Sequence, residues 1–248
     1  MSIVSIENAT LEFPIFSIGS NSIRHHLLEL GTGGLIKSSK GYKTVKSLSN
    51  INLYLEDGSK VGIIGHNGSG KSTLMRLIAG IYNPTSGKIK VEGRISTIFE
   101  LGVGADQDLS GLENILRIGV MMGISFQKLK KLIPKISEFT QLGNFLDLPV
   151  RTYSAGMAMR LYFATALFSD PDILLIDEVF GAGDAAFQQR AAEKLEEQIY
   201  KSRIFMFASH STDLLKKFCD KCLLMDHGKV ILFDKTEKVI EEYSKLKY

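Results

Sequence analysis

Residues 65–72 have the types and the spacing that bind the phosphates of a nucleotide. They read Gly-His-Asn-Gly-Ser-Gly-Lys-Ser and match the pattern G-x-x-x-x-G-K-[ST] in full. Glycines let backbone N–H groups turn inward around an anion, and a following helix adds partial positive charge at its N-terminus. The Lys71 ammonium group can reach the outer phosphates, and the Ser72 hydroxyl can hold Mg²⁺. The alternative is a glycine-rich turn that matches the pattern by chance.

The residues on either side supply the strand and the helix that this motif requires. Residues 61–64 are an apolar run that predicts a buried strand, and residues 73–79 have the apolar spacing of a helix that ends at Gly80. His66 occupies a variable position of the pattern, and we interpret its side chain as a surface group of the loop rather than a ligand. The expected ATP-binding residues are Gly65, His66, Asn67, Gly68, Ser69, Gly70, Lys71, Ser72 and Thr73.

Two acidic residues follow a second apolar run, at residues 173–176, that predicts another buried strand. In a parallel sheet the end of this strand lies beside the phosphate loop. Asp177 is therefore placed to hold Mg²⁺ through water, and Glu178 to polarise the attacking water. The alternative is a solvated acid pair, since an apolar run before two acids is a weak signal without the phosphate loop.

Two further positions suit contact with a phosphate. His210 follows a strand predicted at residues 203–208, and a strand end can bring it to a γ-phosphate. Ser154 can cap a predicted helix, and Gly156 permits an anion to approach the N–H groups of the first turn. The alternatives are a structural histidine and a simple helix cap.

Composition narrows the class of protein. The net charge of +3 over 248 residues is too small to indicate nucleic acid binding, and no apolar run reaches the roughly 18 residues of a membrane span. The N-terminus lacks the pattern of a signal peptide, so we expect a cytosolic protein or one that lies on the cytosolic side of a membrane. Cys219 and Cys222 have C-x-x-C spacing, and we interpret them as half-buried thiols rather than a redox or zinc motif.

The order of the predicted elements indicates an α/β fold. Strands and helices alternate, which favours a mostly parallel sheet covered on both faces. Helical spacing dominates from about residue 105 to 170, and we predict a helical subdomain there. Residues 19–43 form a predicted insertion between the N-terminal strands, and we predict a short amphipathic helix at 21–30 within it. The predicted strands are residues 1–18, 45–55, 61–64, 88–91, 95–99, 173–176 and 203–208 and a hairpin at 223–233; the predicted longer helices are 111–122, 126–140, 154–168 and 184–201, with Asp184 as an N-cap.

With these residues in place, the chain resembles the ATP-binding subunits of ABC transporters over nearly its whole length. The resemblance implies a P-loop NTPase core with an antiparallel N-terminal part, a switch histidine at His210, and a dimer-contact loop at residues 181–184 that includes Asp184. Glu100 stands where the family usually has a glutamine that senses Mg²⁺. The implied signature is Ser154, Ala155, Gly156 and Met157 after Tyr153, in which Tyr153, Ala155 and Met157 depart from the common Leu, Gly and Gln.

At the positions where it departs from the common pattern, the chain resembles the ATP-binding subunits of the exporters of O-antigen, capsule and teichoic acid chains. The shared features are the glycine-rich stretch 100–104, residues 109–115, the Tyr-Ser-x-Gly-Met signature and the insertion at 19–43. The resemblance implies an ATPase that uses Mg²⁺, in which two copies sandwich two ATP molecules. It also implies an integral membrane subunit as partner, a lipid-linked polysaccharide as cargo, and a peripheral position on the cytoplasmic face of the bacterial inner membrane.

Other functions are weighed against this one. A soluble ABC ATPase of DNA repair would insert a long coiled coil between Lys71 and Ser154, where this chain has a short interval containing Pro134 and Pro149. A translation factor of this family usually carries two ATP sites, and a non-catalytic module would not need Glu178. A transporter ATPase for a different cargo stays open. We expect no additional C-terminal sugar-binding domain, because the chain ends soon after the predicted hairpin.

Overall fold

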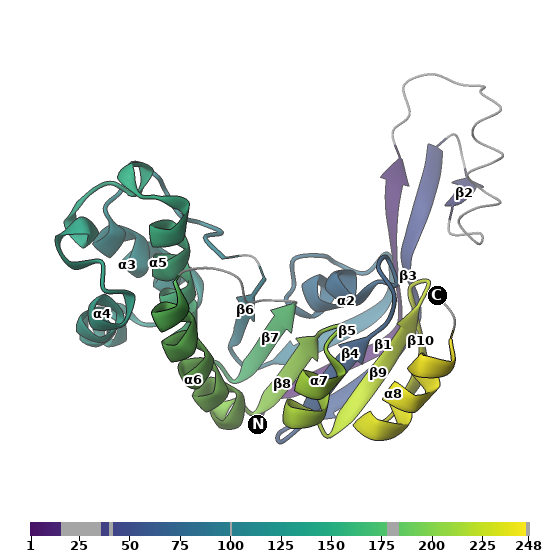
Figure 1. Cartoon of the computed structure of the whole chain (residues 1–248). Helices are drawn as coiled ribbons and strands as arrows, with labels where there is room; N and C mark the ends of the chain where they lie inside the picture. Colours follow the sequence, from purple (N-terminus) through teal and green to yellow (C-terminus); the bar gives the residue numbers. More distant parts are fainter. Residues whose placement is uncertain (16–35, 40–41, 100, 178–183, 247–248) are drawn as a thin grey trace. The chain divides into compact units, whose positions relative to one another are not determined.

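A computed structural model describes residues 1–15, 36–39, 42–99, 101–177 and 184–246 (Figure 1). The chain forms two compact units, one of residues Met1–Glu92 with Met206–Tyr248 and one of residues Gly93–Phe205. Several sequence predictions lie outside the described residues: the helix at 21–30, Glu100, Glu178, and residues 181–183 of the dimer-contact loop.

The first unit contains an antiparallel sheet built from the N-terminal third of the chain. Its strand order is β2 (Ile36–Ser39), β3 (Tyr42–Glu56), β1 (Ile3–Ile15) and β5 (Ser86–Glu92). Every pairing within this sheet is antiparallel. Val4 and Ile6 of β1 are buried while Ser5 between them and Glu7 after them are more exposed, as expected for a sheet with one covered face. The predicted antiparallel N-terminal part is therefore confirmed.

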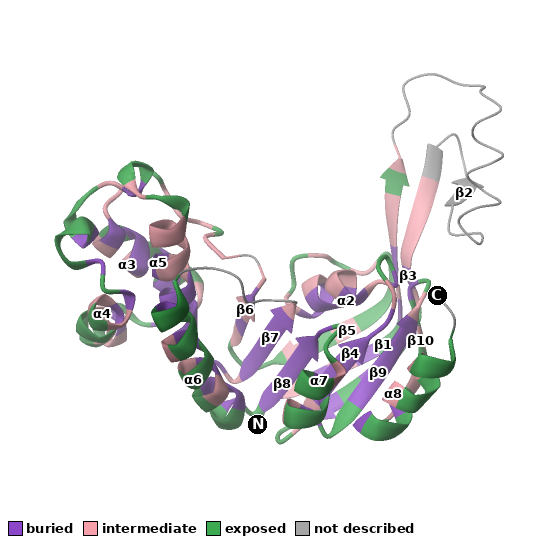
Figure 2. Ribbon diagram, viewed as in Figure 1, coloured by how far each residue is buried: buried purple, intermediate pink, exposed green. Residues whose placement is uncertain are grey.

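A second sheet of the first unit carries the strand before the phosphate loop. Its order is β10 (Lys229–Lys235), β9 (Lys221–Asp226), β4 (Lys60–Ile64) and β8 (Ile204–Ala208), whose last three residues belong to this unit. β4 pairs in parallel with β9, and β9 turns back into β10. Figure 2 shows β4 and β9 buried along most of their length, because helices α7 (Thr212–Phe218) and α8 (Thr236–Lys245) pack against β4.

The turn between β9 and β10 has the geometry of a two-residue hairpin loop. His227 has φ +42° and Gly228 has φ +74°, so both central residues are left-handed, which matches the twist of the two strands. A Cβ atom on Gly228 would lie 2.4 Å from the Ser47 carbonyl oxygen, so glycine is required at this position. The hairpin predicted from Asp226-His227-Gly228 is confirmed.

The second unit combines a parallel strand pair with four long helices. β6 (Ile95–Ile98) pairs in parallel with β7 (Ile173–Asp177), and the start of β8 adjoins β7. The helices are α3 (Gly111–Met121), α4 (Phe126–Thr140), α5 (Ala155–Leu167) and α6 (Ala185–Lys201). Their bounds lie within a residue of the predicted ones at each end. Two short 3₁₀ turns, Gly143–Asp147 and Val150–Thr152, were not predicted.

Side chains from three of these helices and the connecting turns form one apolar core. The core helices α3, α4 and α5 fall inside the segment predicted for the helical subdomain. Serine caps define where they begin: the Ser110 hydroxyl accepts from the Glu113 N–H at 3.2 Å, and the Ser110 N–H donates to Glu113. This reciprocal capping box lowers the pKa of Glu113. The buried core residues are Ile115, Ile136, Leu142, Leu146, Val150, Leu161 and Ala164.

The two cysteines lie at the end of α7 and in β9. Cys219 is 5% exposed and Cys222 is fully buried, so they are more buried than the predicted half-buried thiols. Burial raises the pKa of both thiols, that of Cys222 to about 11. Both are therefore protonated and unreactive at neutral pH, and neither forms a disulfide. Within the ranges that the structure describes, no helix is long and apolar enough to cross a bilayer.

Candidate functional site

The phosphate loop lies between β4 and α2 (Lys71–Ile78), in the first unit. Gly68 has φ +82° and Gly70 has φ +106°, a left-handed conformation that favours glycine. A Cβ atom on Gly70 would also crowd Leu48, Met225 and Gly228 at 3.2–3.3 Å. The loop therefore has the strand–turn–helix context that the sequence predicts, with Gly70 as the residue before the helix.

Lys71 is held inside this loop by the loop's own carbonyl groups. Its Nζ donates to the Gly65 carbonyl oxygen at 2.8 Å and to the His66 carbonyl oxygen at 3.2 Å. The residue is 7% exposed, which is unusual for a lysine. The helix N-terminus and this buried ammonium group together make the loop electropositive, which suits an anion.

His210 lies at this loop, as predicted from its place after β8. Its Nε2 is 3.4 Å from Lys71 Nζ and 3.1 Å from Asn67 Oδ1. The N–H of the preceding residue, Ser209, donates to the Ile63 carbonyl oxygen of β4 at 3.3 Å and so fixes the strand end beside the loop. Nε2 can accept from Lys71 only when His210 carries its proton on Nδ1, and Asn67 must then present its amide nitrogen. The tautomer and the amide orientation are therefore coupled.

The β9–β10 turn supports the phosphate loop from the side, a contact that sequence reasoning missed. The Gly228 N–H donates to the Ser69 carbonyl oxygen at 2.8 Å, and the Gly228 carbonyl accepts from the Ser49 N–H at 2.8 Å. His66 Nε2 lies 3.0 Å from Asp226 Oδ1. The contact arises because β4 pairs in parallel with β9. This pairing sets Ile64 opposite Leu224 and brings together the residues that follow each strand.

His66 differs from its predicted role as a plain surface group. Its side chain is 21% exposed because it packs against the hairpin turn rather than projecting into solvent. The reason is the parallel register of β4 and β9, which sequence periodicity does not reveal. Thr73 lies in the first turn of α2. Its hydroxyl accepts from the Ser47 hydroxyl at 3.0 Å, so Thr73 links this helix to β3.

The predicted signature residues lie at the start of α5 in the second unit. The Ser154 hydroxyl accepts from the Met157 N–H at 3.2 Å, so Ser154 is the N-cap. The nearest atom to a Cβ on Gly156 would be the Ser154 hydroxyl oxygen at 3.9 Å, so packing within this unit does not require glycine there. Tyr153, which departs from the family's leucine, donates its hydroxyl to the Phe145 carbonyl oxygen at 2.6 Å. Its burial raises the pKa of that hydroxyl.

Asp184 begins α6 and is tied to α5 of the same unit. Its carboxylate accepts from the Phe187 N–H at 2.8 Å, which confirms the predicted N-cap and is the main cause of a lowered pKa. The other carboxylate oxygen pairs with the Arg160 guanidinium group at 2.6 Å, and that group also stacks over the Phe187 ring. Arg160 was not singled out from the sequence, because no local motif pairs it with Asp184.

Asp177 is the last residue of β7 and is partly buried there, where the sequence places it. Its carboxylate and the Ser72 hydroxyl at the start of α2 are hard oxygen donors, the type that Mg²⁺ prefers. Each of these two donors, taken by itself, is of a type that fits Mg²⁺, while Glu178 and Glu100 lie outside the described residues.

The arrangement of a strand, a glycine loop with an inward lysine, and a helix defines a P-loop NTPase fold. A family described as ABC transporter matches residues 48–181. The chain is 50% identical to the O-antigen export system ATP-binding protein RfbE of Yersinia enterocolitica, over 92% of this chain and 96% of that protein. It therefore belongs to the ABC transporter family, as an ABC ATPase domain.

A second relative agrees with this family, and a solved structure agrees with the fold. The teichoic acids export ATP-binding protein TagH of Staphylococcus epidermidis is 36% identical over 97% of this chain and 87% of that protein. A dimeric ATP-binding cassette in a post-hydrolysis state, bound to ADP and Pi, has a TM-score of 0.67 over 94% of this chain and 98% of that chain. The latter is 20% identical and bears on the fold alone. The predicted α/β fold with an inserted helical part is confirmed.

Proposed function

We propose that this protein is the ATP-hydrolysing subunit of an exporter that moves a lipid-linked polysaccharide across the bacterial cytoplasmic membrane. The observation that carries this proposal is the 50% identity to an O-antigen export ATP-binding protein, maintained over 96% of that protein. Similarity to a teichoic acid export protein supports the same class of cargo. The subunit would lie at the cytoplasmic face of the membrane, bound to an integral membrane partner.

In the proposed reaction, the loop from Gly65 to Thr73 binds the ATP phosphates through its N–H groups and Lys71. Mg²⁺, when bound, neutralises phosphate charge. Ser72 and Asp177 are the residues that would hold it. Glu178 would polarise the attacking water, and His210 would contact the γ-phosphate from its position beside Lys71 and Asn67.

A second copy of the chain would complete each ATP site. The proposal rests on the start of α5, where Ser154 caps the helix and Gly156 leaves the first turn open to an approaching anion. Ala155 and Met157 share this first turn. Because packing inside the unit leaves room at Gly156, an external ligand is the better reason for a glycine there. Asp184 would contribute to the dimer contact.

The test of the proposed function is complementation in the native host. Cells that lack the gene should lose the surface polysaccharide, and the wild-type gene should restore it. The Lys71→Ala gene, which removes the loop's ammonium group, should be expressed equally but fail to restore it. Unchanged surface polysaccharide in the deleted strain would refute this cargo and favour an ABC ATPase with a different one.

The predicted helix at residues 21–30 provides a separate prediction about the membrane contact. With helical spacing, Ile23, Leu27 and Leu30 share one face, and so short a helix is marginal in water without a surface to pack on. We expect Leu27→Glu with Leu30→Glu to abolish export while ATP binding and Tm are kept, because this face would meet the membrane or its partner. A Tm well below that of wild type would instead place the face in the protein's own core.

A further inference from the structure

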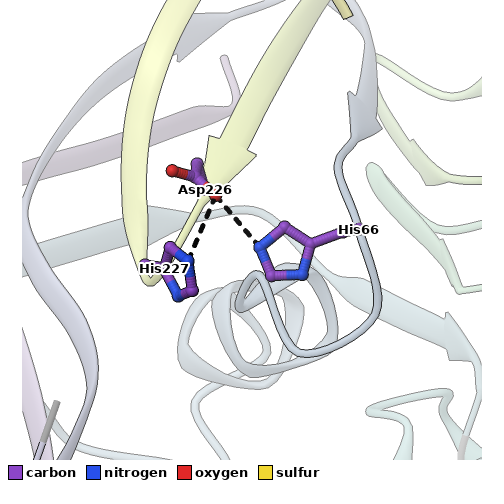
Figure 3. A group of neighbouring side chains, drawn as sticks. All are labelled: His66, Asp226 and His227. Atoms are coloured by element: carbon purple, nitrogen blue, oxygen red, sulfur yellow. Dashed lines mark hydrogen bonds and ion pairs between the residues drawn. The ribbon is translucent and has the colours of Figure 1, made fainter. Parts of the chain in front are cut away.

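Three side chains gather beside the phosphate loop and form what we term the histidine cluster: His66, Asp226 and His227 (Figure 3). His66 Nε2 lies 3.0 Å and His227 Nε2 lies 3.8 Å from the same oxygen, Asp226 Oδ1. One ligand atom from each residue lies within 4.8 Å of the others. The two imidazole rings are 5.0 Å apart between centroids. Two ring nitrogens and one carboxylate oxygen, all able to bind a metal ion, are thus close together.

The orientation of His66 is set by the backbone. Its Nδ1 lies 2.7 Å from the Asn67 carbonyl oxygen, which can only accept, so Nδ1 carries a proton and donates. In the neutral ring, Nε2 then presents its lone pair toward the Asp226 carboxylate. The Nε2 atom and the Asp226 oxygen are 3.0 Å apart, close enough for both to bind one metal ion. A histidine that donates its second nitrogen to a backbone carbonyl is the usual arrangement of a metal ligand.

The backbone that carries the cluster is fixed. Asp226 and His227 belong to the β9–β10 turn, whose left-handed residues at 227 and 228 leave little freedom. The Gly228 N–H donates to the Ser69 carbonyl oxygen at 2.8 Å, which ties the turn to the loop that carries His66. The ligands therefore come from two segments already held together, so little ordering is needed to bind an ion.

We propose that the histidine cluster is a binding site for a first-row transition dication, with Zn²⁺ as the ion that fits best. Zn–N and Zn–O bonds are about 2.0–2.2 Å, so ligand atoms of a tetrahedral ion lie about 3.3 Å apart. The observed separations of 3.0 and 3.8 Å lie on either side of that value. Three protein ligands leave the fourth position for water. Mg²⁺ is excluded by the two imidazoles, because it prefers oxygen ligands.

A metal ion bound here would connect the phosphate loop to the hairpin through side chains as well as backbone. His66 immediately precedes Asn67, whose side chain contacts His210. The ion would therefore restrain the segment that binds the ATP phosphates in the proposed function. All three ligands come from the first unit of this chain. The proposed metal site can therefore be tested on the purified chain, whatever cargo the transporter moves.

The experiment titrates Zn²⁺ into the metal-free, nucleotide-free full chain by calorimetry and follows Tm. We expect one saturable site per chain and a Tm increase of roughly 5 °C or more at a hundredfold excess over Kd. His227→Asn removes one ligand and keeps a residue that tolerates the left-handed turn, so it should fold and bind ATP normally but bind zinc at least about tenfold more weakly. Lys229→Asn, at an exposed position of the same hairpin, is the matched control and should bind zinc like wild type.

Co²⁺ absorption distinguishes the competing metal sites. Ligation by the cluster gives visible bands without a thiolate charge-transfer band, because none of its three ligands is a cysteine. A thiolate band would move the metal to Cys219 and Cys222 and overturn the proposal. Equal zinc affinity in His227→Asn, or a wild-type Tm that zinc leaves unchanged, would also overturn the proposal.

Discussion

Replacing Glu178 by Gln should lower the rate of ATP hydrolysis by about 10² to 10⁴-fold while ATP binding stays nearly intact. The substitution keeps the size of the side chain but removes the carboxylate that would polarise the attacking water. In the sequence Glu178 directly follows Asp177, the last residue of the buried strand β7, and this order is the basis for the proposed role. The measurement is steady-state phosphate release together with equilibrium binding of a fluorescent ATP analogue.

The matched control is Glu193→Gln, the same chemical change on an exposed position of α6. It should leave both turnover and ATP binding unchanged. If Glu178→Gln hydrolyses ATP within about threefold of the wild-type rate, Glu178 is not the general base. Loss of ATP binding in the variant would likewise remove the basis for that assignment.

The second large effect expected is a change in oligomeric state. Glu178→Gln with Mg-ATP should sediment as a dimer, whereas the wild type without nucleotide should sediment mainly as a monomer away from the membrane. The reason is mass action: ATP that contacts the loop of one copy and the α5 start of the other stabilises only the closed pair. Blocking hydrolysis preserves that pair. A monomer at saturating Mg-ATP would contradict the two-copy site.

Gly156→Asp tests the same site without disturbing the monomer. A side chain has room at this position, since the nearest atom to a Cβ would be 3.9 Å away. A negative charge in the first turn of α5 also favours the helix itself. In the Glu178→Gln background it should nevertheless prevent the dimer, because it would repel the phosphates of ATP held by the other copy. Ser154→Arg should do the same, with some loss of stability because it removes the N-cap.

Much of the fold follows from local sequence signals, and the helices show why. Ser154 and Asp184 cap α5 and α6 with their own side chains, so the start of each helix is encoded within a few residues. The left-handed pair at His227 and Gly228 likewise marks its hairpin locally. Helix α8 was missed because it is short, Thr236–Lys245, and only Thr236 and Val239 of it are buried, so few apolar positions mark it in the sequence.

What sequence reasoning missed depends on which strands become neighbours. The phosphate loop was identified from its glycines and Lys71, but its support by Gly228 requires β4 and β9 to be paired in one register. His66 was predicted to be a surface group because its contact with the hairpin also depends on that strand pairing. The ion pair between Arg160 and Asp184 also joins residues of separate helices. Such contacts are set by tertiary packing rather than by periodicity or motif spacing.

Isolation of the native complex is the decisive test of whether ATP hydrolysis by this chain drives export of a lipid-linked polysaccharide. The chain would be affinity-purified from its own host as the Glu178→Gln variant, and the bound lipids would be identified by mass spectrometry. We expect the chain to copurify with an equal amount of an integral membrane subunit and with a polysaccharide on a lipid carrier. Recovery of a membrane subunit carrying a different class of molecule, or of no membrane subunit at all, would contradict the proposed export function.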